Sequence, residues 1–247
     1  MKFTIVTIVR NGEKFIMQTI KSVLEQDYEN LEYLIIDGNS SDSTVKIVTE
    51  LAKESGRDVM IYSEPDFGIY NAMNRGIARA SGEYIIFMNA GDSFWSSGVL
   101  TAMEKRIRRN GKAIYYGKAC LMKNGRRIGF KDAAALGQTV FDMLMKGRMP
   151  AHQSIVAPTD TLRANYFNEQ YKIRADYDWL IRSYKDGVKF VNLDMVVCNY
   201  DYSGFSSKAI EDHTLQAETS LIRKKNYPVA GRIYELLEKC QAFVRKG

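Results

Sequence analysis

The N-terminal part of the chain alternates between short apolar runs and segments of helical periodicity, and this pattern constrains the fold most. β-Branched and aromatic residues fill four runs, at residues 4–9, 33–37, 59–63 and 84–88. Between the first two runs, Ile16, Ile20 and Val23 recur at helical spacing. Such alternation predicts right-handed βαβ units and an α/β fold with a mostly parallel sheet. Ligands bind such sheets at the carboxyl ends of the strands.

Carboxylates and amides follow the second, third and fourth runs: Asp37, Asp66, Asn89 and Asp92. Each alone is as typical of a turn or a helix cap as of a ligand site, but all four share one predicted edge. We expect Asp37 to accept a hydrogen bond from a nucleotide base and Asp92 to bind a divalent cation. The side chains expected to frame the phosphates are Asp66, Asn71, Asn74 and Arg75.

Composition excludes several classes of protein. No apolar run approaches the roughly 20 residues that span a bilayer, and residues 1–9 lack signal-peptide form, so we expect a cytoplasmic protein. Cys120, Cys198 and Cys240 are widely spaced and indicate neither a disulfide framework nor a zinc site. The net charge of +6 suits phosphorylated ligands, other polyanions or an anionic membrane surface.

The pattern changes after residue 97, and we divide the chain into 1–97, 98–208 and 209–247. Residues 100–109 are predicted to be helical, and 113–122 and 127–130 to form a hairpin. Further helices are expected at 141–145, 160–164 and 177–185, and strands at 189–193 and 196–200. The last segment is predicted to form basic amphipathic helices, with the cluster Arg223 to Lys225 near an apolar face.

Common nucleotide-binding motifs are absent, but four blocks resemble one known family. The chain has neither Gly-x-Gly-x-x-Gly after its first strand nor a Walker-type Gly-Lys-Ser/Thr. In order and spacing, residues 7–11, 35–44, 64–76 and 87–92 resemble the family 2 glycosyltransferases. The resemblance is strong over residues 1–97 and weaker to about residue 207. It implies the GT-A fold, a Rossmann-like sheet flanked by helices with a mixed acceptor-side half.

The resemblance also implies roles for individual residues. Thr7 and Arg10 would border the nucleotide, Asp37 would read uracil or guanine, and Asp92 would be the acid that binds Mn²⁺ or Mg²⁺. Asn89 and Gly91 stand where many members of the family carry aspartate.

A second block, residues 174–180, resembles the acceptor-side motif of the family. Its catalytic aspartate falls on Asp176, and Ala175 replaces the customary glutamate. In an inverting transfer, one carboxylate takes the proton of the attacking hydroxyl. Asp178 is the competing candidate. In the structural alternative, Asp176 is only the N-cap of the following helix and Asp178 is a first-turn charge that favours the helix dipole.

Other polar and aromatic side chains are secondary candidates. Residues 150–154 are similar to a segment that lies near the donor sugar or the acceptor, which makes His152 and Gln153 candidates, although an isolated histidine is equally typical of a hydrogen-bonded core. His213 is expected to face solvent. The Gly/Ser stretch at 203–206 is expected to fold over the donor. Trp95 and Trp179 are expected to be packing residues.

The sequence therefore predicts a metal-dependent, inverting glycosyltransferase that uses a UDP- or GDP-linked sugar. Its acceptor is expected to be a glycan or a lipid-linked saccharide in polysaccharide biosynthesis. Peripheral contact with an anionic membrane and a homodimer are compatible with this prediction, and no nucleic-acid partner is expected. The alternatives are a nucleotidyltransferase and a catalytically silent protein that binds a nucleotide sugar or a glycan.

Overall fold

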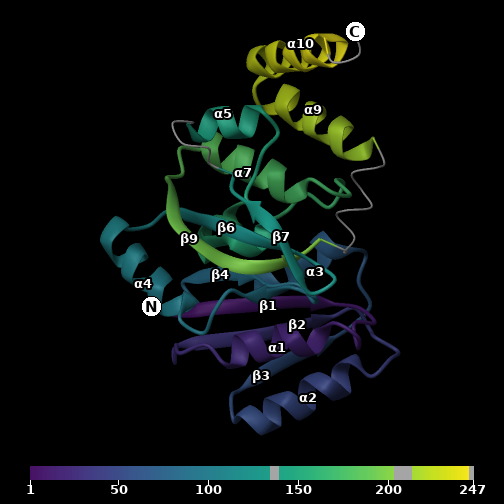
Figure 1. Ribbon diagram of the computed structural model, residues 1–247, viewed down its shortest axis with the longest axis vertical. Coiled ribbons are helices and arrows are strands. Elements are labelled where there is room, and N and C mark those ends of the chain that lie inside the picture. The colour runs from purple at the N-terminus through teal and green to yellow at the C-terminus, as the bar shows by residue number, and fades with distance from the viewer. Residues whose placement is uncertain (134–138, 203–212, 245–247) are drawn as a thin grey trace.

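The computed structural model describes residues 1–133, 139–202 and 213–244 (Figure 1). Four parallel strands form the first half of its sheet in the order β3-β2-β1-β4. Their bounds are β1 Phe3–Val9, β2 Leu31–Asp37, β3 Val59–Ser63 and β4 Tyr84–Phe87. The strands connect through α1 Ile16–Leu24, α2 Thr44–Ser55 and α3 Ile69–Arg79. The predicted α/β class and the four N-terminal strands are confirmed.

The chain reverses its winding direction between β1 and β4, and the two faces of the sheet are covered by different helices. The apolar side chains of α1 pack on one face together with those of α4, Val99–Asn110. On the other face α3 packs with α7, Ala175–Lys185. A ligand crevice is expected at the carboxyl ends of the strands where the winding reverses.

The second half of the sheet is mixed, as predicted. Beyond β4 the order continues β8-β6-β9-β5, with β7 paired to the outer part of β6. The bounds are β5 Ser93–Phe94, β6 Ile114–Lys123, β7 Arg126–Lys131, β8 Ile155–Pro158 and β9 Phe190–Asp201. Strand β8 is antiparallel to both β4 and β6, so it joins the two halves into one sheet.

The prediction of two strands at 189–193 and 196–200 is wrong, because β9 is one continuous strand. The backbone of Asp194 is left-handed (φ 46°), and the pairing of β9 with β6 changes register beside it. Gly117 of β6 lies opposite, where a Cβ atom would stand 2.7 Å from the carbonyl oxygen of Met195. Tyr116 pairs with Asn192 and Lys118 with Val196, so this bulge accommodates two extra residues of β9 without ending the strand.

Three further helices of the second half agree with the prediction to within two residues: α5 Val140–Met145, α6 Thr159–Ala164 and α7. The sequence pattern does not predict the 3₁₀ turn η1 His152–Ser154. Helix α7 begins at Ala175, two residues earlier than expected. Asp176 therefore lies in the first helical turn, and not in front of the helix.

Two C-terminal helices, α9 Thr214–Asn226 and α10 Pro228–Val244, form a hairpin beside α5 and α7 (Figure 1). The hairpin is anchored by Arg223, whose guanidinium donates to the carbonyl of Met145 and pairs with Glu238 through two contacts of 2.9 Å. Among the described residues, no helix has both the length and the apolar character needed to cross a membrane.

Candidate functional site

The loops that follow β1, β2 and β3 meet at the predicted edge of the sheet. Gly38 directly follows β2, and a Cβ atom there would lie 2.3 Å from Oδ2 of Asp66 and 3.2 Å from Cβ of Arg10. Arg10 is exposed and makes no hydrogen bond or ion pair with a described residue. The structure thus brings Arg10, the Asp37 loop and Asp66 together, and only glycine fits between them.

Asp37 and Thr7, by contrast, use their polar atoms within the protein. Asp37 is fully buried, and its carboxylate accepts hydrogen bonds from the amide of Ser40 (3.0 Å) and from the hydroxyls of Ser63 (2.6 Å) and Ser40. The hydroxyl of Thr7 donates to the carbonyl of Met88 (2.8 Å) and lies 3.0 Å from the Tyr33 hydroxyl. In this structure Asp37 organises its loop and Thr7 links neighbouring strands.

The three side chains of α3 expected at the phosphates have other partners. The amides of Asn71 and Asn74 donate to Glu169 at 3.1 and 2.8 Å. Arg75 pairs with Glu64 at 3.0 Å. These contacts hold neighbouring loops on α3, and the assignment of Asn71, Asn74 and Arg75 to the phosphates stays a prediction.

A tight turn after β4 carries Asn89 and Asp92 and is fixed by α1. The amide of Asp92 donates to the carbonyl of Asn89 (3.0 Å), and Gly91 between them has a φ of 102°. Thr19 of α1 accepts from the Gly91 amide (3.0 Å) and donates to the Asp92 carbonyl (2.7 Å). The turn is thus bonded to a helix that packs on the core of the sheet.

The carboxylate of Asp92 is buried without a cationic partner among the described residues. It accepts hydrogen bonds from the amide of Asp201 (2.8 Å) and from the side-chain amide of Gln153. Burial raises its pKa to about 7, because a charged carboxylate loses its hydration there. The oxygens Asn89 Oδ1 and Gln153 Oε1 are buried and have no hydrogen-bond partner in the described part of the chain.

These oxygens suit Mn²⁺ or Mg²⁺ in their chemistry, since both ions prefer carboxylate and carbonyl ligands. A bound cation would also supply the counter-charge that Asp92 lacks. The described residues contain no group of three acids, histidines or cysteines arranged around a metal position. A cation bound by Asp92 and Asn89 would therefore need further oxygen ligands, which the phosphates of a substrate could supply.

His152 connects this turn to α7. Its Nε2 lies 2.8 Å from the amide nitrogen of Asn89, and its Nδ1 lies 3.8 Å from Oδ2 of Asp176. Burial lowers the pKa of His152 to about 4, although the charge of Asp176 opposes this shift. The ring is therefore neutral. With the Asn89 amide in this orientation its nitrogen donates to Nε2, which assigns the ring proton to Nδ1, on the side of Asp176.

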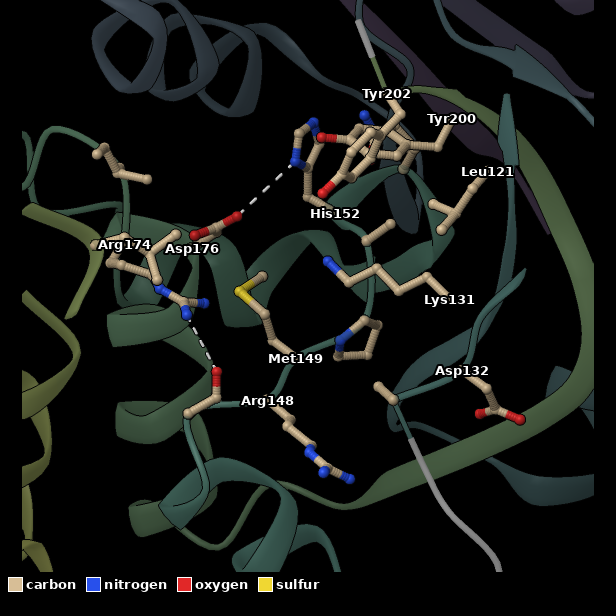
Figure 2. Close-up of a pocket in the computed structure, with 17 residues that line it drawn as sticks. Leu121, Lys131, Asp132, Arg148, Met149, His152, Arg174, Asp176, Tyr200 and Tyr202 are labelled. Carbon is tan, nitrogen blue, oxygen red and sulfur yellow. Dashed lines mark hydrogen bonds and ion pairs between the residues drawn. The ribbon is translucent and has the colours of Figure 1, made fainter. Parts of the chain in front are cut away.

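The two aspartates of α7 have different environments. Nε of Arg182 donates to Asp178 at 2.7 Å, one turn along the helix, and Asp178 is 1% exposed. Oδ1 of Asp176 accepts from the amide of Tyr177 (2.8 Å). It also lies 3.2 Å from the hydroxyl of Tyr70, which has a shorter contact, 2.6 Å, with the carbonyl of Ile173. Its Oδ2 faces a cavity beside His152 (Figure 2). The structure thus separates a carboxylate in an ion pair from one that can receive a proton.

The cavity has a volume of about 470 Å³ and contains Asp176, His152 and Gln153 in its lining. It also brings in residues that the sequence did not mark as site residues, chiefly Lys131, Arg148, Arg174 and Tyr202. Arg10, Asp37 and Asp66 do not line it. The candidate site therefore has two parts, the polar edge formed by the loops after β1, β2 and β3, and the cavity. The turn after β4 contacts the cavity through Asn89 and His152.

The other predicted residues are placed as follows. Trp179 is buried, as predicted, whereas Trp95 is 42% exposed with its edge against Phe130. His213 is exposed. The Gly/Ser stretch at 203–206 lies outside the described residues.

Comparison with protein families gives one match that spans most of the chain. The family model described as glycosyl transferase family 2 matches residues 4–214. A PGL/p-HBAD biosynthesis glycosyltransferase of Mycobacterium bovis is 26% identical over 213 residues, which cover 85% of this chain and 80% of the relative. The amylovoran biosynthesis glycosyltransferase AmsB of Erwinia amylovora is 26% identical over 81% of this chain and 69% of its own length.

Solved structures show the same fold at low sequence identity. The crystal structure of S. aureus TarS 1–349 in complex with UDP-GlcNAc matches with a TM-score of 0.71 and 18% identity, over 92% of this chain and 68% of that one. The mannosyltransferase PcManGT from Pyrobaculum calidifontis, in complex with GDP-Man and Mn²⁺, matches with a TM-score of 0.64 and 16% identity. This second match covers all of the chain and 81% of PcManGT.

Proposed function

This chain belongs to glycosyl transferase family 2, and we propose that it transfers a sugar, with inversion, from a nucleoside diphosphate donor to a hydroxyl of a glycan or a lipid-linked saccharide. We place the reaction in the assembly of a surface polysaccharide or glycolipid. The family match over residues 4–214 and the relatives named for glycan biosynthesis support this proposal.

The observation that carries the proposal is the environment of Asp176. Its carboxylate faces the cavity and makes no ion pair with a described arginine or lysine, whereas Asp178 is engaged with Arg182. Asp176 takes the proton of the acceptor hydroxyl while that oxygen forms a bond with the anomeric carbon. The bond from that carbon to the diphosphate breaks, and the nucleoside diphosphate leaves with its electrons.

His152 and Tyr70 orient the base. The Tyr177 amide donates to Oδ1 of Asp176, and the Tyr70 hydroxyl lies 3.2 Å from the same oxygen, which leaves Oδ2 to the acceptor. The Nδ1 proton of His152 points to the same oxygen from 3.8 Å and helps to stabilise the charged carboxylate before the proton arrives.

The nucleotide binds at the edge formed by Arg10, the Asp37 loop and Asp66 in this proposal. Arg10 supplies a positive charge beside the phosphates, and Asp37 shapes the loop that meets the base. Asp92, with Asn89, would hold Mn²⁺ or Mg²⁺ against the diphosphate, where the cation stabilises the negative charge of the leaving group. The UDP-GlcNAc bound to TarS and the GDP-Man bound to PcManGT support a UDP- or GDP-linked donor.

A panel of UDP- and GDP-sugars with Mn²⁺ tests the enzyme against a silent binding protein. We expect slow release of UDP or GDP from one donor in the absence of acceptor, abolished by EDTA. Binding of a donor without any release, even with a mixture of lipid-linked and free glycans, would contradict the proposed transfer.

We also propose that the protein works in the cytoplasm at a membrane surface, through the α9–α10 hairpin. The hairpin exposes five large apolar side chains: Leu221, Val229, Ile233, Leu236 and Leu237. The basic cluster needs a correction, because Arg223 is buried and Lys224 pairs with Glu235 at 3.2 Å, while Lys225 is exposed. Apolar insertion would therefore contribute more than charge.

Co-sedimentation with neutral and anionic vesicles tests this surface. Replacing Leu236 and Leu237 by serine should abolish binding, whereas a serine at the exposed Met60, far from the hairpin in the sequence, should not. If the hairpin instead pairs two copies of the chain, the same double variant will convert a dimer into a monomer in solution and leave vesicle binding unchanged.

A further inference from the structure

Three basic side chains line the cavity that contains Asp176. Lys131 ends β7, Arg148 precedes η1, and Arg174 precedes α7. Figure 2 shows Lys131 reaching into the space between His152 and Met149, with Arg174 beside Asp176. The acids in the same lining are Asp132 and Asp176, and Asp132 pairs with Lys118 at 3.4 Å. The three basic side chains of the lining therefore face one carboxylate, Asp176, that is not paired with a lysine outside the lining.

Lys131 is less accessible than Arg148. Its side chain is half-buried, and it forms no hydrogen bond or ion pair with a described residue. Burial lowers the pKa of Lys131, the nearby charge of Asp176 opposes this shift, and Arg174 adds to it. The ordinary state of a partly buried lysine is an ion pair, so its ammonium group has unused hydrogen-bond donors.

The two arginines also have donors to spare. Arg148 is exposed and has no hydrogen-bond or ion-pair partner among the described residues. Arg174 donates to the carbonyl of Gly147 (3.1 Å) and lies 5.0 Å above the ring of Tyr177, but its buried Nε has no partner in the described part of the chain. Guanidinium groups with free donors are well suited to carboxylate and phosphate oxygens.

The position of these cations assigns them to the acceptor. His152 lies on the side of the cavity that contacts Asn89. Asn89 belongs to the turn after β4, where the donor diphosphate is proposed to bind. Figure 2 shows Arg148 at the opposite end from His152. The proposed base, Asp176, lies between, and it takes its proton from the acceptor. A group that reaches Lys131 and Arg148 therefore belongs to the molecule that carries the attacking hydroxyl.

We propose that the cavity binds an anionic group of the acceptor, a carboxylate or a phosphate, through Lys131, Arg148 and Arg174. The inference rests on the proposed transfer reaction and narrows its acceptor class to acidic saccharides or saccharides linked through phosphate. The anion supplies the counter-charge that the cavity lacks and places the neighbouring sugar with its hydroxyl at Asp176.

The experiment uses the full chain and two anionic probes, methyl β-D-glucuronide and glucose 1-phosphate, with methyl β-D-glucoside as the neutral control. Each is titrated in the presence of saturating nucleoside diphosphate, so that the donor diphosphate position is filled. The imidazole NMR signals report the site, because the chain has two histidines. His152 lines the cavity, and the exposed His213 serves as an internal reference.

We expect at least one anionic probe to shift the His152 signal without shifting that of His213, and the glucoside to have no effect. A response to the glucuronide assigns an acidic sugar, and a response to glucose 1-phosphate assigns a phosphate. Lys131→Met and Arg148→Ala should each weaken the response about tenfold, the usual loss for one charge-assisted hydrogen bond. Lys112→Met, whose exposed lysine pairs with Asp160 away from the cavity, is the matched control.

Two results would overturn the inference. One is the absence of any His152 response to either anion. The other is a loss of nucleoside diphosphate affinity in Lys131→Met, which would assign the lysine to the donor. Since Arg148 is exposed and unpaired among the described residues, its replacement does not endanger folding and tests the same anion site should Lys131→Met be unstable. Failure of the transfer reaction is detected separately, by the donor panel, which needs no acceptor anion.

Discussion

The proposed nucleotide edge, formed by the loops after β1, β2 and β3, differs from the proposed acceptor cavity in how its polar groups are paired. At the edge, Asp37 is satisfied by Ser40 and Ser63, and Thr7 by strand partners. In the cavity, Lys131 and Arg148 have no partner among the described residues, and Oδ2 of Asp176 faces open space. Apart from Arg10, which has no partner among the described residues, the edge is thus organised before any ligand binds. The charges of the cavity become balanced only when a substrate is present.

This difference has a physical basis. Groups that hydrogen-bond one another fix the loops and reduce the conformational entropy lost on binding. Groups left unpaired beside a cavity cost stability in the free protein but are available to the reaction. The contrast predicts that substitutions in the cavity change catalysis more than folding, and that substitutions in structural networks do the reverse.

The largest effect is expected for Asp176→Asn, which removes the proton acceptor and keeps the shape of the side chain. We expect kcat to fall by about 10²- to 10⁴-fold, since this is the usual contribution of a general base. Donor affinity, measured by calorimetry, should remain unchanged. Near-normal transfer to a defined acceptor would remove Asp176 from the mechanism.

Asp178→Asn provides the opposite case in the same helical turn. It breaks a nearly buried ion pair with Arg182, so the free energy of unfolding should fall by about 2 to 3 kcal/mol. The kcat of the folded fraction should stay within a few-fold of the parent. Urea denaturation measures the first quantity, and transfer assays at low temperature measure the second. A stable but inactive Asp178→Asn protein would reverse the assignment of the two aspartates.

Asp37→Ala tests whether the carboxylate serves the nucleotide or only the loop. If it reaches the base, nucleotide binding should weaken by about 1 to 3 kcal/mol. Ser63→Ala is the matched control, because it removes a hydrogen bond to the same carboxylate but leaves the charge in place. Equal losses of affinity in both variants would mean that Asp37 acts through loop structure alone.

The raised pKa of Asp92 predicts that stability depends on pH. A folded-state pKa of about 7, above the ordinary 3.8, means that the folded protein binds the proton more tightly, so stability decreases as pH rises from about 4 to 7. The rise from 3.8 to about 7 corresponds to about 4 kcal/mol, at about 1.4 kcal/mol per pH unit. Asp92→Asn has no charge to bury but accepts one hydrogen bond fewer, so it should be about 2 to 3 kcal/mol more stable than the parent at pH 8 with EDTA.

The lowered pKa of His152 has the opposite effect between pH 4 and 6.5, because its unfolded state binds the extra proton there. This contribution is common to both proteins and cancels in their difference. The difference in unfolding free energy should therefore approach a constant at low pH and grow toward pH 8. A difference that is flat across this range would show that Asp92 is not destabilised by its burial.

The smallest effect is expected for Asn89→Asp, which restores the acid that many family members carry. An aspartate would accept from Nε2 of His152 and move the ring proton away from Nδ1, weakening its support of Asp176. The loss should be about 1 kcal/mol, or about fivefold in kcat. Nitrogen-15 NMR of the His152 ring should report the change of tautomer, and an unchanged ring would contradict the proposed hydrogen bond.

The two halves also differ in how well the sequence predicts them. Strands β1 to β4 are mostly continuous apolar runs, so the sequence pattern places them to within one residue or two. Strand β8 escapes such reasoning, because its four residues end in Pro158 and their pairing with β4 and β6 is long-range. The break predicted inside β9 comes from the polar stretch around Asp194, which the structure accommodates as a bulge.

The sequence likewise predicts only some residues of the candidate site. Asp176, His152 and Asp92 can be singled out from sequence blocks, and the spacing of Asp178 and Arg182 is a readable sign of an ion pair within a helix. Lys131 cannot be found this way, because at the end of a short hairpin strand it resembles any solvent-facing basic residue. Its burial depends on residues 148–152 and 174–176, which only the tertiary fold brings beside it.

The contacts of Arg223 with Met145 and Glu238 have a practical consequence for protein engineering. Deleting α10 to improve the solubility of the protein would leave the guanidinium of Arg223, which is 1% exposed, without its carboxylate partner, because Glu238 lies on the deleted helix. An uncompensated buried charge of this kind commonly costs several kcal/mol, enough to lower yield by unfolding α9 and the neighbouring α5. Replacing the exposed Leu236 and Leu237 by polar residues, with Glu238 retained, should improve solubility without breaking this ion pair.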